Sequence, residues 1–342
     1  MLEVKNLTLG DAFSFEKEGA LGELFSVVVV KYSYDIKEGE LRLSNNPPGI
    51  TLADRYFGEP EKSSLEIEGD LVLQKPGTDL WLTGKAKAPS NKPERGWTAE
   101  IQVGPIGAVY ALCGPRYWEF QDPKGWTLTQ PEEVTSVELR YENAFGGLRQ
   151  TAAAELEAWP SNPVGKGYLN VGGLNRKERY GAPSILFADD VYTKPEHLPR
   201  TAPLGPINRW WKERYKFAGT YDKAWEDTWK GKRPFPCLPA DFNTRFCNAA
   251  HPTFVATPHL KGGEPMVLSG FGSDLNLKTH VPTVAHEALI RDGSRAGELS
   301  PFLLDTVHVD LTNSQVHFVW RLTLPASLDA SSALVRLADL EK

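Results

Sequence analysis

The chain has few cysteines and no long apolar run. Its three cysteines, Cys113, Cys237 and Cys247, are widely spaced and odd in number, so they predict reduced, partly buried thiols and no disulfide framework. No stretch approaches the ~20 apolar residues that a membrane-spanning helix needs. The N-terminus also carries no secretory leader pattern. We therefore expect a protein that starts at Met1, stays in the cytoplasm and does not bind a membrane.

Positive charge is also scarce, because 38 Lys and Arg residues face 44 Asp and Glu residues, for a net charge of -6. A protein that coats nucleic acid or an anionic membrane needs a broad basic surface, so neither class of partner is expected. Hydrophobic residues make up 41% of the chain and charged residues 24%. These values are typical of a globular protein with a sizeable core and exclude the disordered and fibrous classes.

Local motifs for nucleotide binding, metal binding and hydrolysis are missing. No phosphate-binding loop follows a strand, and no nucleophile elbow occurs. His286-Glu287 lacks the second histidine of a zinc-protease helix, and Cys237, Cys247 and His251 have spacings that fit a zinc site poorly. The sequence therefore nominates no catalytic residue, no metal ligand and no cofactor.

Short strands separated by turn residues dominate both ends of the chain. The clearest examples are hairpins over residues 25–43 and 305–324, in which β-branched and aromatic residues alternate with polar ones. His308 and His317 could meet as a cross-strand pair in the second hairpin, and residues 327–342 fit either a short helix or a last strand. The pattern predicts a mainly β protein of antiparallel sandwich-like or barrel-like sheets, with a loop-rich middle region that carries short helices.

Three regions follow from this pattern. Residues 1–141 are expected to form an N-terminal antiparallel β region, and residues 259–342 a C-terminal β region packed with the N-terminal sheets as one unit. Residues 142–258 lose the alternation and are rich in Gly, Pro, Asn and Trp. So long an irregular stretch is unusual in a compact protein. It predicts a region that is either functional or held on the sheets by its aromatic side chains.

Within the middle region, residues 203–250 contain four of the ten tryptophans, interspersed with basic residues. Asn208 is expected to cap a helix of about ten residues that stops at Gly219, which can take a left-handed conformation. Thr220 is then expected to cap a second short helix that stops at Gly231.

The candidate partner contacts are the aromatic and basic side chains of these two helices. They are Arg209, Trp210, Trp211, Lys212, Arg214, Trp225 and Trp229. Mixed aromatic and basic residues are typical of protein-binding hot spots, but large aromatics are also the usual filling of a core. We expect the basic residues to face a partner and Trp225 to support the fold, so that Trp225→Ala unfolds the protein. Exposed strand edges are a competing surface for the partner.

Several short segments also occur in a specific order. They are YENAFGG (141–147), NPVGKGY (162–168), PLGPINRWWKER (203–214) and GTYDKAW (219–225). This order resembles the bacterial domain-of-unknown-function proteins encoded in type VI secretion clusters beside toxin genes and the spike proteins VgrG and PAAR. The resemblance implies a chaperone or adaptor for a secreted toxin effector.

Two functions are therefore expected. The first is a cytoplasmic adaptor, not an enzyme, that binds a toxin effector and helps to load it onto the VgrG/PAAR spike. The alternative is an enzyme that acts on a glycan or on the effector, with a cleft in residues 142–258. A pocket lined by converging carboxylates or histidines would favour the enzyme, whereas an aromatic-rimmed surface would favour binding.

Overall fold

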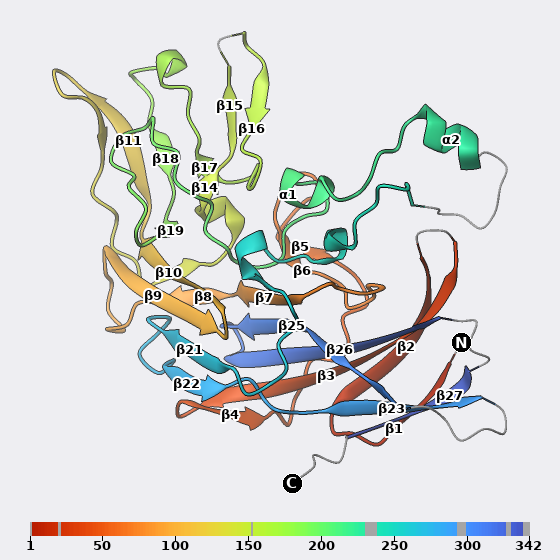
Figure 1. Cartoon of the computed structure of the whole chain (residues 1–342). Coiled ribbons are helices and arrows are strands. Elements are labelled where there is room, and N and C mark those ends of the chain that lie inside the picture. The colour runs from red at the N-terminus through yellow and green to blue at the C-terminus, as the bar shows by residue number, and fades with distance from the viewer. Residues whose placement is uncertain are drawn as a thin grey trace.

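The computed structural model describes residues 2–19, 22–151, 153–229, 238–292, 299–325 and 330–337. Strands account for 44% of the residues and helical turns for 8%. The described residues form several sheets with mostly antiparallel neighbours, and these sheets do not close into a barrel (Figure 1). The prediction of a mainly β protein is confirmed.

The largest sheet is built from both ends of the chain. Its strand order is β2-β3-β26-β25-β7-β20, with β4 paired to β3. Only the β25–β7 pair runs parallel; the other neighbours in this sheet are antiparallel. Its strands are β2 (Asp11–Glu18), β3 (Leu24–Lys37), β4 (Glu40–Leu43), β7 (Thr78–Thr83), β20 (Val255–Ala256), β25 (Leu303–Asp310) and β26 (Gln315–Pro325).

A five-stranded sheet shares its core with the largest sheet. Its order is β19-β10-β9-β21-β22. Val28 and Leu80 of the largest sheet belong to the same buried cluster as Ile101 and Tyr110 of the second sheet, so the two sheets are packed on one core. The strands are β9 (Gly96–Val103), β10 (Ile106–Cys113), β19 (Ile185–Phe187), β21 (Pro265–Ser269) and β22 (Leu277–His280).

Smaller sheets surround these two. A four-stranded sheet contains β1 (Glu3–Asn6), β27 (Ala330–Leu337), β23 (His286–Asp292) and β24 (Leu299–Pro301), and a three-stranded sheet contains β12 (Gly125–Leu128), β11 (Arg116–Gln121) and β18 (Tyr180–Ala182). The two-stranded pairs are β5 (Arg55–Tyr56) with β6 (Leu65–Ile67), β8 (Lys85–Lys87) with β13 (Ser136–Glu138), β14 (Phe145–Gly146) with β17 (Lys166–Gly167), and β15 (Leu148–Gln150) with β16 (Leu156–Ala158).

Helical structure is confined to short turns in the described part of the chain. The α-helices are α1 (Lys212–Tyr215) and α2 (Lys223–Trp229), and the 3-10 turns are η1 (Tyr141–Asn143), η2 (Val171–Gly173), η3 (Thr244–Cys247) and η4 (Pro252–Phe254). In these residues no helix has the length and apolar character that a bilayer crossing requires.

Both predicted hairpins are present. The first consists of β3 and β4, and its turn uses Glu38 and Gly39 with φ angles of 54° and 78°, the left-handed values that a tight hairpin turn requires. In the second, His308 and His317 are directly opposite each other with ring centres 5.2 Å apart, so the proposed cross-strand pair exists. In the ambiguous C-terminal tail, residues 330–337 form the strand β27.

The strand β3 is buried on both faces in its central part, residues 27–33. Val28 and Val30 point into the main core, whereas Val27 and Val29 pack with Leu71 and neighbouring residues on the opposite face. A strand covered on both sides explains the unbroken valine run, because each face needs apolar side chains. The segment that covers the outer face lies between β6 and β7.

Polar and charged side chains of the sheet hold this covering segment. Lys31 on β3 pairs with Asp70 at 3.2 Å. Arg321 on β26 donates to the Val72 carbonyl over 2.7 Å and also pairs with the buried Asp305. The covering segment is therefore fixed by charged hydrogen bonds as well as by apolar packing, which places Glu68 and its neighbours against the sheet.

Glu68 is the centre of a buried ion network. It is fully buried and pairs with Arg214, and the guanidinium of Arg209 and the ammonium of Lys75 lie 3.5 Å and 4.0 Å from its carboxylate. Lys75 also pairs with Asp79 at 2.8 Å. Burial alone would raise the pKa of Glu68, but the three surrounding cations lower it, so the carboxylate stays ionised.

Arg214 was expected to face a partner, and this expectation is wrong. The side chain is buried; besides Glu68 it donates to the carbonyls of Phe246 and Ile207 over 2.8 Å and 3.0 Å. A guanidinium can leave water only when its donors are satisfied, and here the carboxylate and two carbonyls satisfy them. Arg214 therefore holds the segment around α1 on the sheet.

The predicted helices are also shorter or capped differently. The first was expected to run from Asn208 to Gly219, but α1 contains four residues because Asn208 is buried and its carboxamide accepts the backbone N–H of Trp210 in a turn. Gly219 has the predicted left-handed φ of +83°. The second helix is capped by Asp222, which accepts from the Trp225 backbone N–H over 2.8 Å, and not by Thr220. Gly231 lies outside the described residues.

Replacing Arg214 should destabilise the protein strongly, because its loss leaves the buried Glu68 carboxylate without its closest cation. We expect Arg214→Met to lower the free energy of unfolding by about 3–5 kcal/mol in chemical denaturation. The half-exposed Arg209 provides the matched control, and Arg209→Met should cost less than about 1 kcal/mol. Equal effects of the two substitutions would show that the buried pair does not support the fold.

His286 should make folding pH-dependent. It is buried among Tyr32, Phe302 and Trp320, and neither ring nitrogen has a hydrogen-bond partner among the described residues. Burial lowers its pKa from 6.5 to about 4, so between these values a falling pH protonates the unfolded chain but not the folded one and reduces stability. When the pH falls through this range, the His286→Phe variant should therefore lose about 3 kcal/mol less free energy of unfolding than the unchanged protein.

The measurement is the free energy of unfolding of both proteins at neutral and acidic pH. His308 and His317, whose pKa values burial also lowers, remain in the variant and contribute equally to both curves. An unchanged pH slope in His286→Phe would contradict the assignment.

Candidate functional site

Residues 201–208 run through the core before the chain reaches the surface. All of them are buried, and two tyrosines hold their backbone. The Tyr110 hydroxyl donates to the Pro203 carbonyl over 2.6 Å, and the Tyr141 hydroxyl donates to the Gly205 carbonyl over 3.2 Å. These bonds from core side chains determine where the following residues emerge.

The side chains of Trp210 and Trp211, which follow this segment, lie in different environments. Trp211 is buried edge-on against Tyr141, with ring centres 5.0 Å apart, whereas Trp210 is 69% exposed. The turn before them is held by Asn208, which accepts from the Trp210 backbone N–H and donates to the Pro60 carbonyl, both over 3.2 Å. One tryptophan therefore anchors the segment and the other is presented to solvent.

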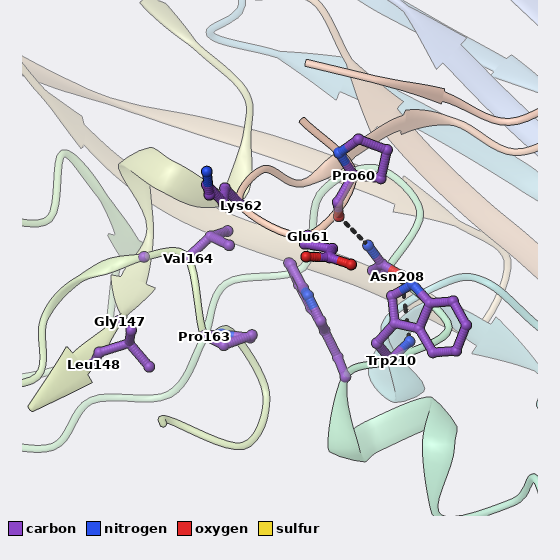
Figure 2. Close-up of a pocket in the computed structure, with 11 residues that line it drawn as sticks. Pro60, Glu61, Lys62, Gly147, Leu148, Pro163, Val164, Asn208 and Trp210 are labelled. Atoms are coloured by element: carbon purple, nitrogen blue, oxygen red, sulfur yellow. Dashed lines mark hydrogen bonds between the residues drawn. The ribbon is translucent and has the colours of Figure 1, made fainter. Parts of the chain in front are cut away.

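An open pocket of about 820 Å³, here called the Trp210 pocket, lies beside the two tryptophans. Its lining residues are Pro60, Glu61, Lys62, Gly147, Leu148, Pro163, Val164, Gly165, Asn208, Trp210 and Trp211. Figure 2 shows Trp210 and Asn208 on one side and Val164, Pro163 and Leu148 on the other. Four separate parts of the chain therefore build one mostly apolar hollow.

The wall opposite Trp210 is built by two of the turn-rich segments noted in the sequence, residues 141–147 and 162–168. The buried carboxamide of Asn162 donates to the Tyr141 carbonyl over 2.8 Å, and the Asn162 carbonyl accepts from the Gly147 N–H over 2.8 Å. Gly147 has a φ of +107°, which a residue with a side chain rarely adopts. These contacts bring the two segments together as the parallel pair β14–β17.

The β15–β16 hairpin extends away from the two large sheets (Figure 1), and its Leu148 lines the pocket. Its register places Leu148 and Leu156 on one face, and their side chains are 56% and 73% exposed. The opposite face carries Arg149, which pairs with Glu157 at 2.7 Å and stacks over the Tyr168 ring at 4.2 Å. The polar face is therefore partnered inside the molecule, while the leucine face is open.

The lining of the Trp210 pocket has little catalytic chemistry. Its charged residues are Glu61 and Lys62, and its eleven residues include no histidine. The described ranges contain no group of three or more His, Cys, Asp or Glu side chains arranged to hold a metal. Cys113 and Cys247 are unpaired thiols, and Cys237 falls in a gap between the described ranges. The pocket is thus a mostly apolar hollow with Trp210 at one side (Figure 2).

The predicted contact residues lie in different environments. Trp210 and Trp211 line the pocket, and the neighbouring Lys212 is exposed. Arg209 is half-exposed and pairs with Asp54 at 3.3 Å, so it borders both the surface and the ion network. Arg214 belongs to the buried network and is removed from the contact surface.

Trp225 and Trp229 do not line the Trp210 pocket. Both lie on α2, which has no buried residue, and the Trp225 ring stacks edge-on with Tyr221 at 4.8 Å. The expectation that Trp225 is a core residue is therefore wrong, because α2 has no buried residue and projects from the sheets (Figure 1).

Several residues of the site were not identified in the sequence. Pro60, Glu61 and Lys62 carry no local signal, since only the tertiary fold brings them to Asn208. Val164 and Leu148 belong to turn-rich segments whose glycines indicated special backbone conformations but not a pocket.

Comparison with known proteins gives one result. No curated protein and no solved structure matches the chain significantly. Residues 22–321 match the family described as an uncharacterized protein conserved in bacteria (DUF2169), and this match includes every residue of the Trp210 pocket. The chain therefore belongs to this bacterial family.

Proposed function

We propose that the protein is a cytoplasmic chaperone or adaptor of the type VI secretion system that binds a toxin effector and helps to load it onto the VgrG/PAAR spike. The proposal rests on the sequence resemblance for its biological setting and on the Trp210 pocket for its mode of action. The single observation that carries it is the 69% exposed Trp210 at the edge of a mostly apolar pocket.

An exposed tryptophan beside a hollow is suited to a protein partner. Tryptophan buries a large area when it is covered, and it is enriched among the few residues that dominate binding energy. Here Trp211 and Asn208 hold the backbone of Trp210 in place, so little conformational entropy is lost when a partner covers the ring. The exposed Leu148 and Leu156 extend the same apolar surface.

The enzyme alternative has less support in the region where it was expected. The Trp210 pocket lies largely within residues 142–258, but its lining contains one carboxylate and no histidine. Catalysis on a glycan would need a pair of acidic groups across the bound sugar. Binding of a protein segment needs no such pair, so this pocket favours the adaptor, although another pocket, of about 410 Å³ and outside residues 142–258, is lined by His308, His317 and Asp310.

Replacing Trp210 should weaken the complex with the toxin without unfolding the protein. We expect Trp210→Ala to raise the Kd for the toxin encoded beside this gene by roughly 30-fold, about 2 kcal/mol. The test is co-expression and co-purification followed by titration, with thermal unfolding as the check on folding. Leu9→Ala is the matched control, because Leu9 is 78% exposed and is not among the pocket residues.

A toxin that does not co-purify with the unchanged protein, and whose export is unaffected by deletion of this gene, would overturn the proposal. Equal weakening by Leu9→Ala would show instead that the effect is not specific to the pocket.

A further inference from the structure

A second pocket of about 470 Å³ is lined in part by other residues of the segment 207–217. Its apolar wall includes Ile207, Phe217 and Val255, and its charged lining includes Lys216 and Arg245. It shares no lining residue with the Trp210 pocket, although residues 207–217 contribute to both. We call it the Arg245 pocket.

The charges around the Arg245 pocket are not balanced. Lys216 pairs with Glu213 at 2.5 Å, and Arg214 pairs with the buried Glu68. Arg245 has no carboxylate partner among the described residues. One guanidinium charge is therefore left without a counter-charge at a pocket that also offers apolar walls.

The backbone of Arg245 is nevertheless held in position, and its side chain lies near an aromatic ring. Its backbone N–H donates to the Asn243 side chain over 3.0 Å at the start of η3, and its guanidinium lies 5.8 Å from the centre of the Phe217 ring. Lys216 approaches the same ring at 5.3 Å. At this distance from the aromatic ring, the guanidinium edge stays free for the two parallel hydrogen bonds that a carboxylate accepts.

We infer that the Arg245 pocket receives a carboxylate side chain from an acidic segment of the protein partner, with a neighbouring apolar side chain of that segment on the partly exposed Phe217 and Val255. The inference rests on the proposed adaptor function and adds the chemistry of the partner: an acidic segment with apolar anchors that reaches the pockets formed by residues 207–217.

A phosphate group fits this pocket less well than a carboxylate. Glu213 is part of the lining, and a doubly charged phosphate would be repelled by it. The chain as a whole carries a net charge of -6, which opposes the broad attraction that nucleic acids or other polyphosphates need. A single carboxylate satisfies the one unmatched guanidinium.

The test uses the full-length protein, labelled with ¹⁵N, and two octapeptides that differ only in charge. One contains a phenylalanine followed by two glutamates. The other keeps the phenylalanine and carries two glutamines in place of the glutamates. We expect the glutamate peptide to bind about tenfold more tightly than the glutamine peptide. Binding of the glutamate peptide should shift the Nε–H signal of Arg245, which is identified by its absence from the spectrum of the Arg245→Gln variant.

Arg245→Gln should abolish the preference for glutamate, and Arg245→Lys should retain part of it. Arg176→Gln is the matched control, because Arg176 is also exposed and stacks over a phenylalanine, Phe120, at 4.5 Å; it should leave the preference unchanged. Equal affinity of the two peptides, no binding of either, or displacement of the glutamate peptide by equimolar inorganic phosphate would overturn the inference.

Failure of this inference is distinguishable from failure of the adaptor proposal. If Trp210→Ala disrupts the toxin complex while Arg245→Gln affects neither the complex nor the peptide, the Arg245 inference alone is wrong. If no toxin complex forms but the glutamate preference depends on Arg245, the pocket stands and the proposed function is wrong.

Discussion

The buried pairing of Glu68 with Arg214 connects the parts of the molecule that the backbone hydrogen bonds of the sheets leave separate. Glu68 belongs to the segment that covers the outer face of the largest sheet, and Arg214 belongs to α1 in the middle region. Two charges without water are stable only when each finds its counter-charge, so the covering segment and α1 must take up mutually consistent positions. The same network continues through Lys75 and Asp79 to the sheet itself.

Both pockets depend on this constraint. The segment 207–217 is attached at Ile207 and Arg214, and the residues between and after these points line a pocket on either part. A rigid attachment below the surface lets Trp210 remain exposed without flexibility of its backbone. The tryptophan-rich stretch therefore does not form a core of its own. The buried Arg214 attaches it to the rest of the fold, and its outer side chains stay exposed.

Much of the β architecture could be predicted because its signal is local. Alternation and turn residues identified β3 with β4 and β25 with β26. The helices were less predictable. Asn208 is a good helix cap by residue type, but its burial against Pro60 made it the centre of a turn instead. Local preference was overridden by a distant contact.

The sequence by itself determined the mainly β class, the irregular middle region and the left-handed turn at Gly219, because each follows from residue type and spacing. Only the tertiary structure decided which of its residues are accessible. Arg209 and Arg214 are the same residue type five positions apart, yet one borders solvent and the other is buried on Glu68. Both contact the Glu68 carboxylate, more than a hundred residues away in the chain, and Arg214 also donates to the Phe246 and Ile207 carbonyls; no local pattern records these contacts.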